Sequence, residues 1–278
     1  MDKESATKIY GILGYPVKHS FSPAMHNAAF KALNINAEYK LFEIKPQELV
    51  SFLGSLREKN ILGLNVTIPY KEKVIAYLDT ISENAKLIGA VNTIKVSDKG
   101  LQGFNTDGEG FLKHLTEDLG FNPKDKTIAI IGAGGGARAI SVYLSKARVR
   151  RLNIYDLDKA KLLAVLKSLR DNFKDIEIRQ ANSIAELDIK NCDLLINATP
   201  VGMKLADPCL ANATAMHKDL LVYDLIYNPK ETKLLKLAKE NGTRTSNGLG
   251  MLLYQGILSF EIWMTQKPPK EVMRKALE

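Results

Sequence analysis

The chain has 278 residues, enough for two domains of ordinary size, and its 45% hydrophobic and 25% charged residues are typical of a globular protein. It has no apolar run of the roughly 18 residues that a membrane-spanning helix needs, and its first residues, MDKESATKIYG, lack the apolar segment of a signal peptide. The formal net charge is +8, but most basic residues alternate with acidic ones, so we expect a cytoplasmic protein that binds neither membranes nor nucleic acids.

Strand and helix patterns alternate through the first half of the chain, which favours an α/β fold with mainly parallel sheets. Helices are predicted at 23–33, 46–59, 71–78 and 83–90, strands at 8–14, 37–44 and 61–68, and a β-hairpin over 91–106. This half has its own layered core, which ends near residue 106.

The second half begins with a predicted helix over 107–120 and a strand, glycine turn and helix over 126–147. Further strands are expected at 151–156, 192–200, 220–227 and 243–248, with helices at 159–173 and 230–241. From Gly248 to the end the pattern is helical.

The glycine turn reads Gly132-Ala133-Gly134-Gly135-Gly136-Ala137, directly after the apolar strand and at the start of a helix. Glycines there allow a tight turn and let backbone amides approach a pyrophosphate, which the helix N-terminus stabilises. The turn therefore predicts a dinucleotide-binding domain of the Rossmann type.

The cofactor is predicted from Asp156, which ends the next strand, 24 residues after Gly132. A carboxylate at this position binds both adenosine ribose hydroxyls of NAD and repels the 2′-phosphate of NADP, so we expect NAD. The alternative is a turn aspartate, as we expect for Asp158, which suits a helix N-cap.

The stretch GYPVKHSFSPAMHN, residues 14–27, gathers hydroxyls and imidazoles before a helix. Ser22 suits the N-cap position with Pro23 in the first turn, whereas Ser20 has no capping role, and two hydroxyls beside helix-end amides can receive an anion. His19 and His26 show no metal-ligand spacing, so we expect no metal. Cys192 and Cys209 form no CxxC motif and are expected to stay reduced.

Two charged residues suggest a reaction centre. Lys71 is predicted in the first turn of a helix after Pro69, where a cation opposes the helix dipole. Asp107 follows the hairpin at the junction of the two halves, where it can cap the next helix or pair with Lys71.

These motifs together resemble the shikimate dehydrogenase family over nearly the whole chain. The matching segments are GYPVKHSFSPAMHN, NVTIPYK (65–71), GAVNT (89–93), GFNTDGEG (103–110), GAGGGARA (132–139), NATPVGM (197–203), YDLIYNP (223–229) and GLGMLLYQG (248–256). The resemblance implies an α/β protein of two domains: a substrate-binding domain, 1–106, completed by C-terminal helices 248–278, and a Rossmann-type domain, 107–247.

The resemblance also implies the activity, reversible reduction of 3-dehydroshikimate to shikimate on the route to chorismate and aromatic amino acids. Lys71 would be the general acid or base, paired with Asp107. The substrate ligands would be Ser20 and Ser22 at its carboxylate, with Thr67, Lys71, Asn92, Asp107, Tyr227 and Gln255 at its ring. Leu225, Gly248 and Met251 would flank the nicotinamide.

In one respect the chain departs from the family, which usually carries Asn-Arg-Thr after the second Rossmann strand to bind the phosphate of NADP. Here the residues are Tyr155-Asp156-Leu157-Asp158, which resembles the NAD-using branch with quinate/shikimate dehydrogenases. Quinate dehydrogenase activity and an inactive nucleotide-sensing regulator are the alternative functions. The expected partner is the small-molecule substrate, and the expected state is a monomer or a homodimer.

Overall fold

The computed structural model describes residues 6–278, which divide into two compact units. Unit 1 contains the residues up to Gly110 together with Leu252–Glu278, and unit 2 contains Phe111–Met251. Both boundaries lie four residues later along the chain than the sequence placed them. Within the described residues, no helix is both long enough and apolar enough to cross a membrane.

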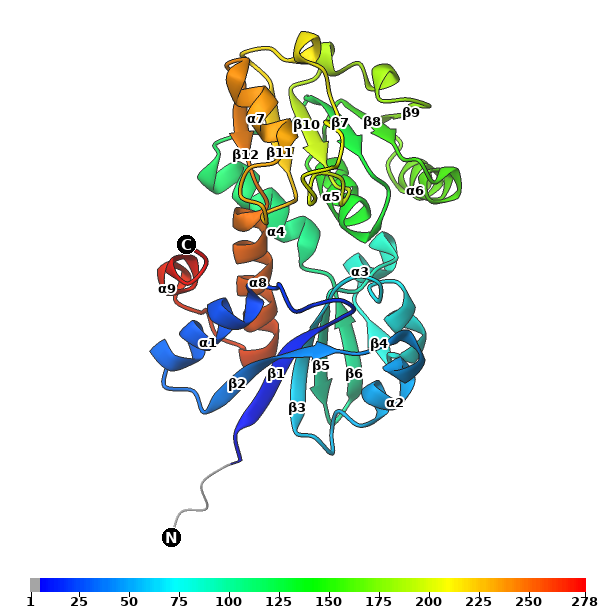
Figure 1. Cartoon of the computed structure of the whole chain (residues 1–278). Helices are drawn as coiled ribbons and strands as arrows, with labels where there is room; N and C mark the ends of the chain where they lie inside the picture. Colours follow the sequence, from blue (N-terminus) through cyan, green and yellow to red (C-terminus); the bar gives the residue numbers. More distant parts are fainter. Residues whose placement is uncertain (1–5) are drawn as a thin grey trace. The chain divides into compact units, whose positions relative to one another are not determined.

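Unit 1 is built on a six-stranded sheet of order β2-β1-β3-β5-β6-β4 (Figure 1). The strands are β1 (Lys8–Gly14), β2 (Ala37–Glu43), β3 (Ile61–Val66), β4 (Thr80–Ile81), β5 (Thr93–Ser97) and β6 (Gly100–Phe104). β1 pairs in parallel with β2 and β3, while the predicted hairpin, β5 and β6, adds antiparallel pairs. β4 pairs in parallel with β6, so the sheet is mixed but mainly parallel, as the sequence predicted.

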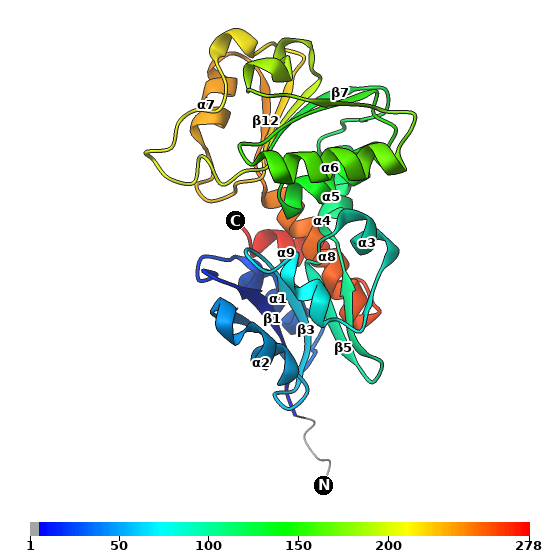
Figure 2. The same cartoon turned by 90° about the vertical axis from the view of Figure 1, so that its right-hand side faces the viewer.

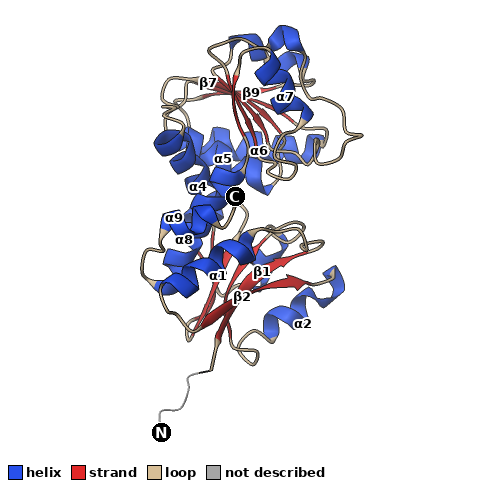
Figure 3. Cartoon of the chain, turned by 60° about the vertical axis from the view of Figure 1, so that its left-hand side comes forward, coloured by secondary structure: helices blue, strands red, loops and turns tan. Residues whose placement is uncertain are grey.

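Helices cover both faces of this sheet. Figure 3 shows α1 (Ser22–Ala32), α9 (Lys270–Lys275) and the C-terminal part of α8 (Leu249–Met264) on one face, and α2 (Leu49–Gly54) on the other. The helix predicted over 46–59 is shorter, a 3-10 turn η1 (Pro46–Glu48) followed by α2, which ends at a glycine of low helix propensity. The helix predicted over 71–78 is a 3-10 turn, η2 (Lys73–Tyr77), with β-branched residues inside it. α3 (Glu83–Ile88) forms as expected.

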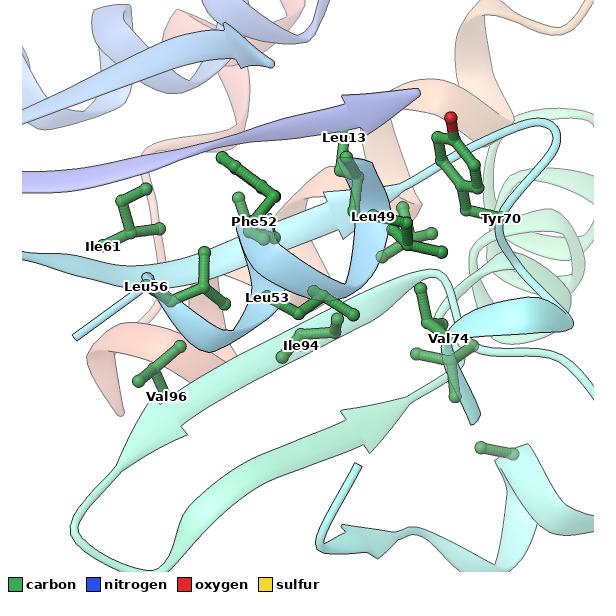
Figure 4. Packing of buried hydrophobic residues seen from close by; sticks show 14 residues of the cluster. Leu13, Leu49, Phe52, Leu53, Leu56, Ile61, Tyr70, Val74, Ile94 and Val96 are labelled. Atoms are coloured by element: carbon green, nitrogen blue, oxygen red, sulfur yellow. The ribbon is translucent and has the colours of Figure 1, made fainter. Parts of the chain in front are cut away.

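The core of unit 1 lies between α2 and the sheet (Figure 4). Leu56 and Ile94 are fully buried there, and Leu64 and Val66 of β3 belong to the same cluster. Because side chains alternate along a strand, Asn65 points to the opposite face, where α8 packs. The Trp263 Nε1–H of α8 donates to the Ile94 carbonyl oxygen at 2.9 Å on that face.

Unit 2 contains a six-stranded parallel sheet of order β12-β11-β10-β7-β8-β9. Its strands are β7 (Thr127–Ile131), β8 (Arg151–Tyr155), β9 (Glu177–Gln180), β10 (Leu194–Asn197), β11 (Leu221–Asp224) and β12 (Arg244–Ser246). Figure 2 shows α5 (Gly135–Lys146) and α6 (Lys159–Asn172) on one face and α7 (Lys233–Glu240) on the other. This strand order is that of a doubly wound dinucleotide-binding fold.

The helix predicted over 107–120 divides into α4 (Asp107–Lys113) and a π-helical turn, η3 (His114–Asp118). The imidazole of His114 lies at this change of pitch, with Nδ1 2.7 Å from the Tyr223 hydroxyl. Tyr223 is fully buried, and burial raises the pKa of its hydroxyl well above the usual value. The contact therefore ties the π-helical turn to the sheet of unit 2.

Candidate active site and dinucleotide loop

A short ion pair lies at the centre of the polar residues of unit 1. Lys71 Nζ is 2.6 Å from Asp107 Oδ2, and the two side chains are only 20% and 7% exposed. Lys71 lies just before η2 rather than in the first turn of an α-helix, so the expected conflict with a helix dipole is wrong. Its main chain is held instead by the Val91 N–H, which donates to the Lys71 carbonyl oxygen at 2.7 Å.

Asn92 holds the second oxygen of the Asp107 carboxylate. The Asn92 Nδ2 group donates to Asp107 Oδ1 and to Thr106 Oγ1, both at 2.9 Å. Asn92 Oδ1 accepts the Thr106 N–H at 2.8 Å. Because a backbone N–H can only donate, this bond fixes the orientation of the Asn92 amide and keeps its NH₂ group facing Asp107.

Gln255 of α8 completes this side of the site. It is 7% exposed, and its Oε1 atom lies 3.4 Å from Asn92 Nδ2. A side chain at Gly110 would bring its Cβ within 2.6 Å of the Gln255 backbone nitrogen, so a glycine is needed where α4 passes this turn of α8. The structure thus brings Lys71, Asn92, Asp107 and Gln255 together.

The loop with two serines is arranged differently from the sequence expectation. Ser22 is the first residue of α1, with Phe21 at the N-cap, and no side chain caps this helix. The expected N-cap role of Ser22 is therefore wrong. The Ser22 N–H donates to Ser20 Oγ at 3.3 Å, which holds the two residues together at the start of α1. Thr67 follows the end of β3, where its N–H donates to the Leu13 carbonyl oxygen at 2.9 Å.

Four polar residues of this region were missed by sequence reasoning: Asn65, Thr93, Thr106 and Ser259 are each 4% exposed or less. One signal was available, because Asn65 stands between apolar residues in a strand predicted to be buried. Ser259 gave no signal of its own, since a serine in an apolar helix is common.

The glycine turn of unit 2 leaves space beside the start of α5. Gly132 has φ +118°, and a Cβ there would lie 2.9 Å from the Ala198 carbonyl oxygen, so this position requires glycine. A Cβ on Gly134 would meet nothing within 4 Å, and one on Gly136 would meet only Leu225 Cδ1, at 3.7 Å. The half-buried backbone of Gly134, Gly135 and Gly136 at the N-terminus of a 12-residue helix fits the pyrophosphate of a dinucleotide.

The carboxylate of Asp156 is turned toward the backbone. Asp156 Oδ2 accepts the Ala133 N–H at 2.6 Å, and Oδ1 accepts the Asp158 N–H at 2.7 Å. Asp158 Oδ1 in turn accepts the Ala160 and Lys161 N–H groups at 3.1 Å, so the predicted N-cap is confirmed. These bonds hold the pKa of the Asp158 carboxyl below its usual value.

The predicted nicotinamide neighbours also lie in unit 2. A Cβ on Gly248 would be 2.0 Å from the Leu225 carbonyl oxygen, so the absence of a side chain lets these two segments meet. Met251 is 9% exposed. Tyr227 is half-buried, and burial raises the pKa of its hydroxyl. The other predicted substrate ligands belong to unit 1.

The two histidines of the first loop differ in environment. His19 is exposed, whereas His26 is fully buried and stacks on the Tyr39 ring at 4.4 Å between centroids. Neither ring nitrogen of His26 has a hydrogen-bond partner, and burial lowers its pKa to about 3. Among residues 6–278, no three histidine, cysteine, aspartate or glutamate side chains are grouped so that they could hold a metal ion.

Comparison with known proteins identifies the family of the chain. Residues 12–94 match the shikimate dehydrogenase substrate binding domain, and residues 248–278 match the shikimate 5′-dehydrogenase C-terminal domain. The chain is 43% identical to the shikimate dehydrogenase (NADP(+)) of Methanopyrus kandleri, over 99% of this chain and 96% of the relative.

Two solved structures are similar over nearly their whole length. A shikimate dehydrogenase in complex with NADP+ has a TM-score of 0.90 and 42% identity, covering 98% of this chain and 94% of the other. The shikimate 5-dehydrogenase of Listeria monocytogenes in complex with shikimate and NAD has a TM-score of 0.90 and 33% identity, covering 100% and 99%.

These relatives correct the cofactor prediction. The expectation that Asp156 selects NAD over NADP is wrong, because curated relatives at 43% identity are NADP(+) enzymes. Both Asp156 oxygens accept backbone N–H groups, so the carboxylate also supports the glycine turn, and its presence at this position does not by itself identify the cofactor. With relatives that match over nearly its whole length, the chain belongs to the shikimate dehydrogenase family.

Proposed function

We propose that Lys71 and Asp107 carry the proton transfer of the family's reaction in this chain. The chain is an oxidoreductase of the shikimate pathway, which catalyses the reversible reduction of 3-dehydroshikimate to shikimate. The observation that supports the proposed roles is the 2.6 Å contact between Lys71 Nζ and Asp107 Oδ2 among largely buried polar side chains.

The cofactor is NADP(H) in this proposal, as in the curated relatives. The turn from Gly132 to Ala137 would hold its pyrophosphate, and Leu225, Gly248 and Met251 would flank its nicotinamide. When bound, NADPH supplies the hydride that reduces the substrate carbonyl carbon.

Lys71 has two tasks during reduction. Its ammonium group stabilises the negative charge that develops on the carbonyl oxygen, and it then donates the proton that makes this oxygen a hydroxyl. In the oxidation of shikimate, neutral Lys71 accepts that proton. Asp107 holds Nζ in place through Oδ2, while its Oδ1 atom is fixed by Asn92.

In this proposal, hydroxyl and amide groups near Lys71 and Asp107 bind the substrate. Ser20 and Ser22 would hold the carboxylate at the start of α1, where backbone N–H groups favour an anion. Thr67, Asn92, Gln255 and Tyr227 would bind ring hydroxyls together with Asp107. The monomeric or homodimeric state and the cytoplasmic location stay predictions of the sequence.

The test replaces Lys71 with alanine and uses Lys73→Ala as the matched control. Lys73 is an exposed lysine two residues away. We expect Lys71→Ala to lower kcat by about 10²–10⁴-fold, because general acid–base catalysis contributes that much. The Kd for shikimate, measured by calorimetry, should change only a few-fold, and Lys73→Ala should keep normal turnover.

Three results would contradict the proposal or redirect it. Near-normal turnover of Lys71→Ala would exclude the general-acid role. Faster turnover of quinate than of shikimate by the unaltered enzyme would make it a quinate dehydrogenase. Absence of turnover on both compounds, with NADP+ and with NAD+, would support a nucleotide-sensing regulator.

A further inference from the structure

The hydroxyl of Ser259 joins four segments of unit 1 beneath the site. Ser259 is fully buried on α8, one turn after Gln255. Its Oγ atom lies 2.9 Å from the Gln255 carbonyl oxygen and 2.9 Å from Asn65 Nδ2. The same atom is 2.8 Å from Thr93 Oγ1 and 3.2 Å from Thr106 Oγ1. A single hydroxyl therefore contacts α8, β3, β5 and the turn before α4.

A serine inside a helix often bonds to the carbonyl four residues earlier, and that bond alone would be structural. The three further contacts make Ser259 different. Asn65 approaches it only as a donor, because Asn65 Oδ1 accepts the Tyr39 hydroxyl at 2.7 Å and Nδ2 also faces the Asn92 carbonyl oxygen at 3.3 Å. Ser259 is thus an acceptor for β3. Because the Thr93 hydroxyl gives its one proton to Asn92 Oδ1, the 2.8 Å contact requires Ser259 to donate to Thr93 Oγ1 rather than to the Gln255 carbonyl oxygen.

Those two threonines help to hold Asn92 Oδ1, whose orientation is fixed by the Thr106 N–H at 2.8 Å. The Thr93 hydroxyl donates to Asn92 Oδ1 at 2.9 Å, and the Thr106 hydroxyl lies 3.2 Å from the same oxygen. With its oxygen held on this side, Asn92 directs Nδ2 at Asp107 Oδ1. A continuous set of hydrogen bonds therefore leads from Ser259 to the carboxylate that holds Lys71.

We propose that Ser259 is a positioning residue of the active site: its hydroxyl fixes Thr93 and Thr106 where they orient Asn92 against Asp107. The proposal rests on the proposed roles of Lys71 and Asp107. Ser259 touches neither of them, so it acts through Asn92. We expect its removal to leave the serine loop that would bind the substrate carboxylate unchanged, because the polar contacts of Ser259 Oγ are with Asn65, Thr93, Thr106 and Gln255.

The experiment compares Ser259→Ala with Ser145→Ala. Ser145 is a matched control, because it is a helical serine of 2% exposure whose Oγ has no hydrogen-bond partner. We expect Ser259→Ala to lower kcat about tenfold, because small displacements of a catalytic pair are costly, with KM for shikimate and Kd for NADP+ within about twofold. Ser145→Ala should keep its kcat.

A double-mutant cycle with Thr93→Val tests the route through which Ser259 acts. If Ser259 works in part through the Thr93 hydroxyl, the loss of kcat in the double variant should be smaller than the two single losses combined. Additive losses would overturn this route.

A lower melting temperature of Ser259→Ala with unchanged kcat would make Ser259 merely structural and overturn the proposal. A raised KM at constant kcat would also overturn it. Normal turnover of Lys71→Ala, measured in parallel, would instead show that the proposed function itself has failed.

Discussion

The carboxylate of Asp156 offers a direct test of why the cofactor prediction failed. If this group supports the glycine turn, its removal should destabilise the protein when no cofactor is bound. The perturbation is Asp156→Ala, which deletes both acceptor oxygens. Asp156→Asn serves as the matched comparison, because it keeps the shape and one acceptor oxygen but loses the charge.

The size of the effect follows from the two hydrogen bonds. The Ala133 N–H donates to Oδ2 at 2.6 Å, and Ala133 is fully buried, so the alanine variant leaves a buried donor unsatisfied at a cost of about 1–3 kcal/mol. The Asp158 N–H donates to Oδ1 at 2.7 Å in an exposed turn, where water can replace the lost acceptor and the cost is about 0.5 kcal/mol. The free energy of unfolding should therefore fall by about 1.5–3.5 kcal/mol.

Urea denaturation of the cofactor-free protein, followed by far-UV circular dichroism, measures this difference. Amide hydrogen exchange should show faster exchange at the Ala133 N–H, and Asp156→Asn should lie between the unaltered protein and the alanine variant. A change below about 0.5 kcal/mol for Asp156→Ala, with unaltered exchange at Ala133, would refute the reasoning. The carboxylate would then not support the turn.

Two further predictions concern the glycine turn and a buried histidine. Gly134→Ala should raise the Kd for NADP+ more than about tenfold, as measured by calorimetry, with little change in stability, because the added Cβ meets no protein atom. Gly132→Ala should instead lower the free energy of unfolding, as measured by urea denaturation, because the φ of Gly132 is +118°. His26 has a folded-state pKa of about 3, below its usual 6.5, so the unfolded state binds the proton preferentially and stability should fall as the pH drops from about 6.5 toward 3, by about 2 kcal/mol at pH 5. His26→Phe should remove this slope in urea titrations, His19→Gln should keep it, and an equal slope in His26→Phe would contradict the assignment.

The features that sequence reasoning predicted correctly depend on local chemistry. A strand, a glycine turn and a helix are decided within a few residues, and so are the N-cap at Asp158 and the hairpin of β5 and β6. The same local rules failed at Ser22, because α1 begins one residue earlier than predicted. Ser22 was a good N-cap by type, yet Phe21 occupies that position and Ser22 begins the helix.

Asp156 failed for a different reason. Its position at the end of β8 was read correctly, but the direction of its carboxylate depends on the Ala133 N–H, which another strand–helix turn brings within 2.6 Å. The rule that links an acid at this position to the ribose takes no account of such backbone hydrogen bonds. Sequence position gives the presence of the group and leaves its hydrogen-bond partners undetermined.

The buried polar residues around Asn92 show the other limit. Thr93 and Ser259 are 166 residues apart in sequence, and their 2.8 Å contact exists only because α8 packs on the sheet face that Asn65 occupies. Each residue alone is unremarkable: a threonine in a strand and a serine in a helix satisfy ordinary propensities. The unusual residue is Asn65, an asparagine inside a buried strand. Its amide must find hydrogen-bond partners, because an unpaired buried amide costs about 2–7 kcal/mol. From Asn65, the sequence alone could have predicted that polar side chains of other segments contact this amide. It could not have identified Ser259 as one of them.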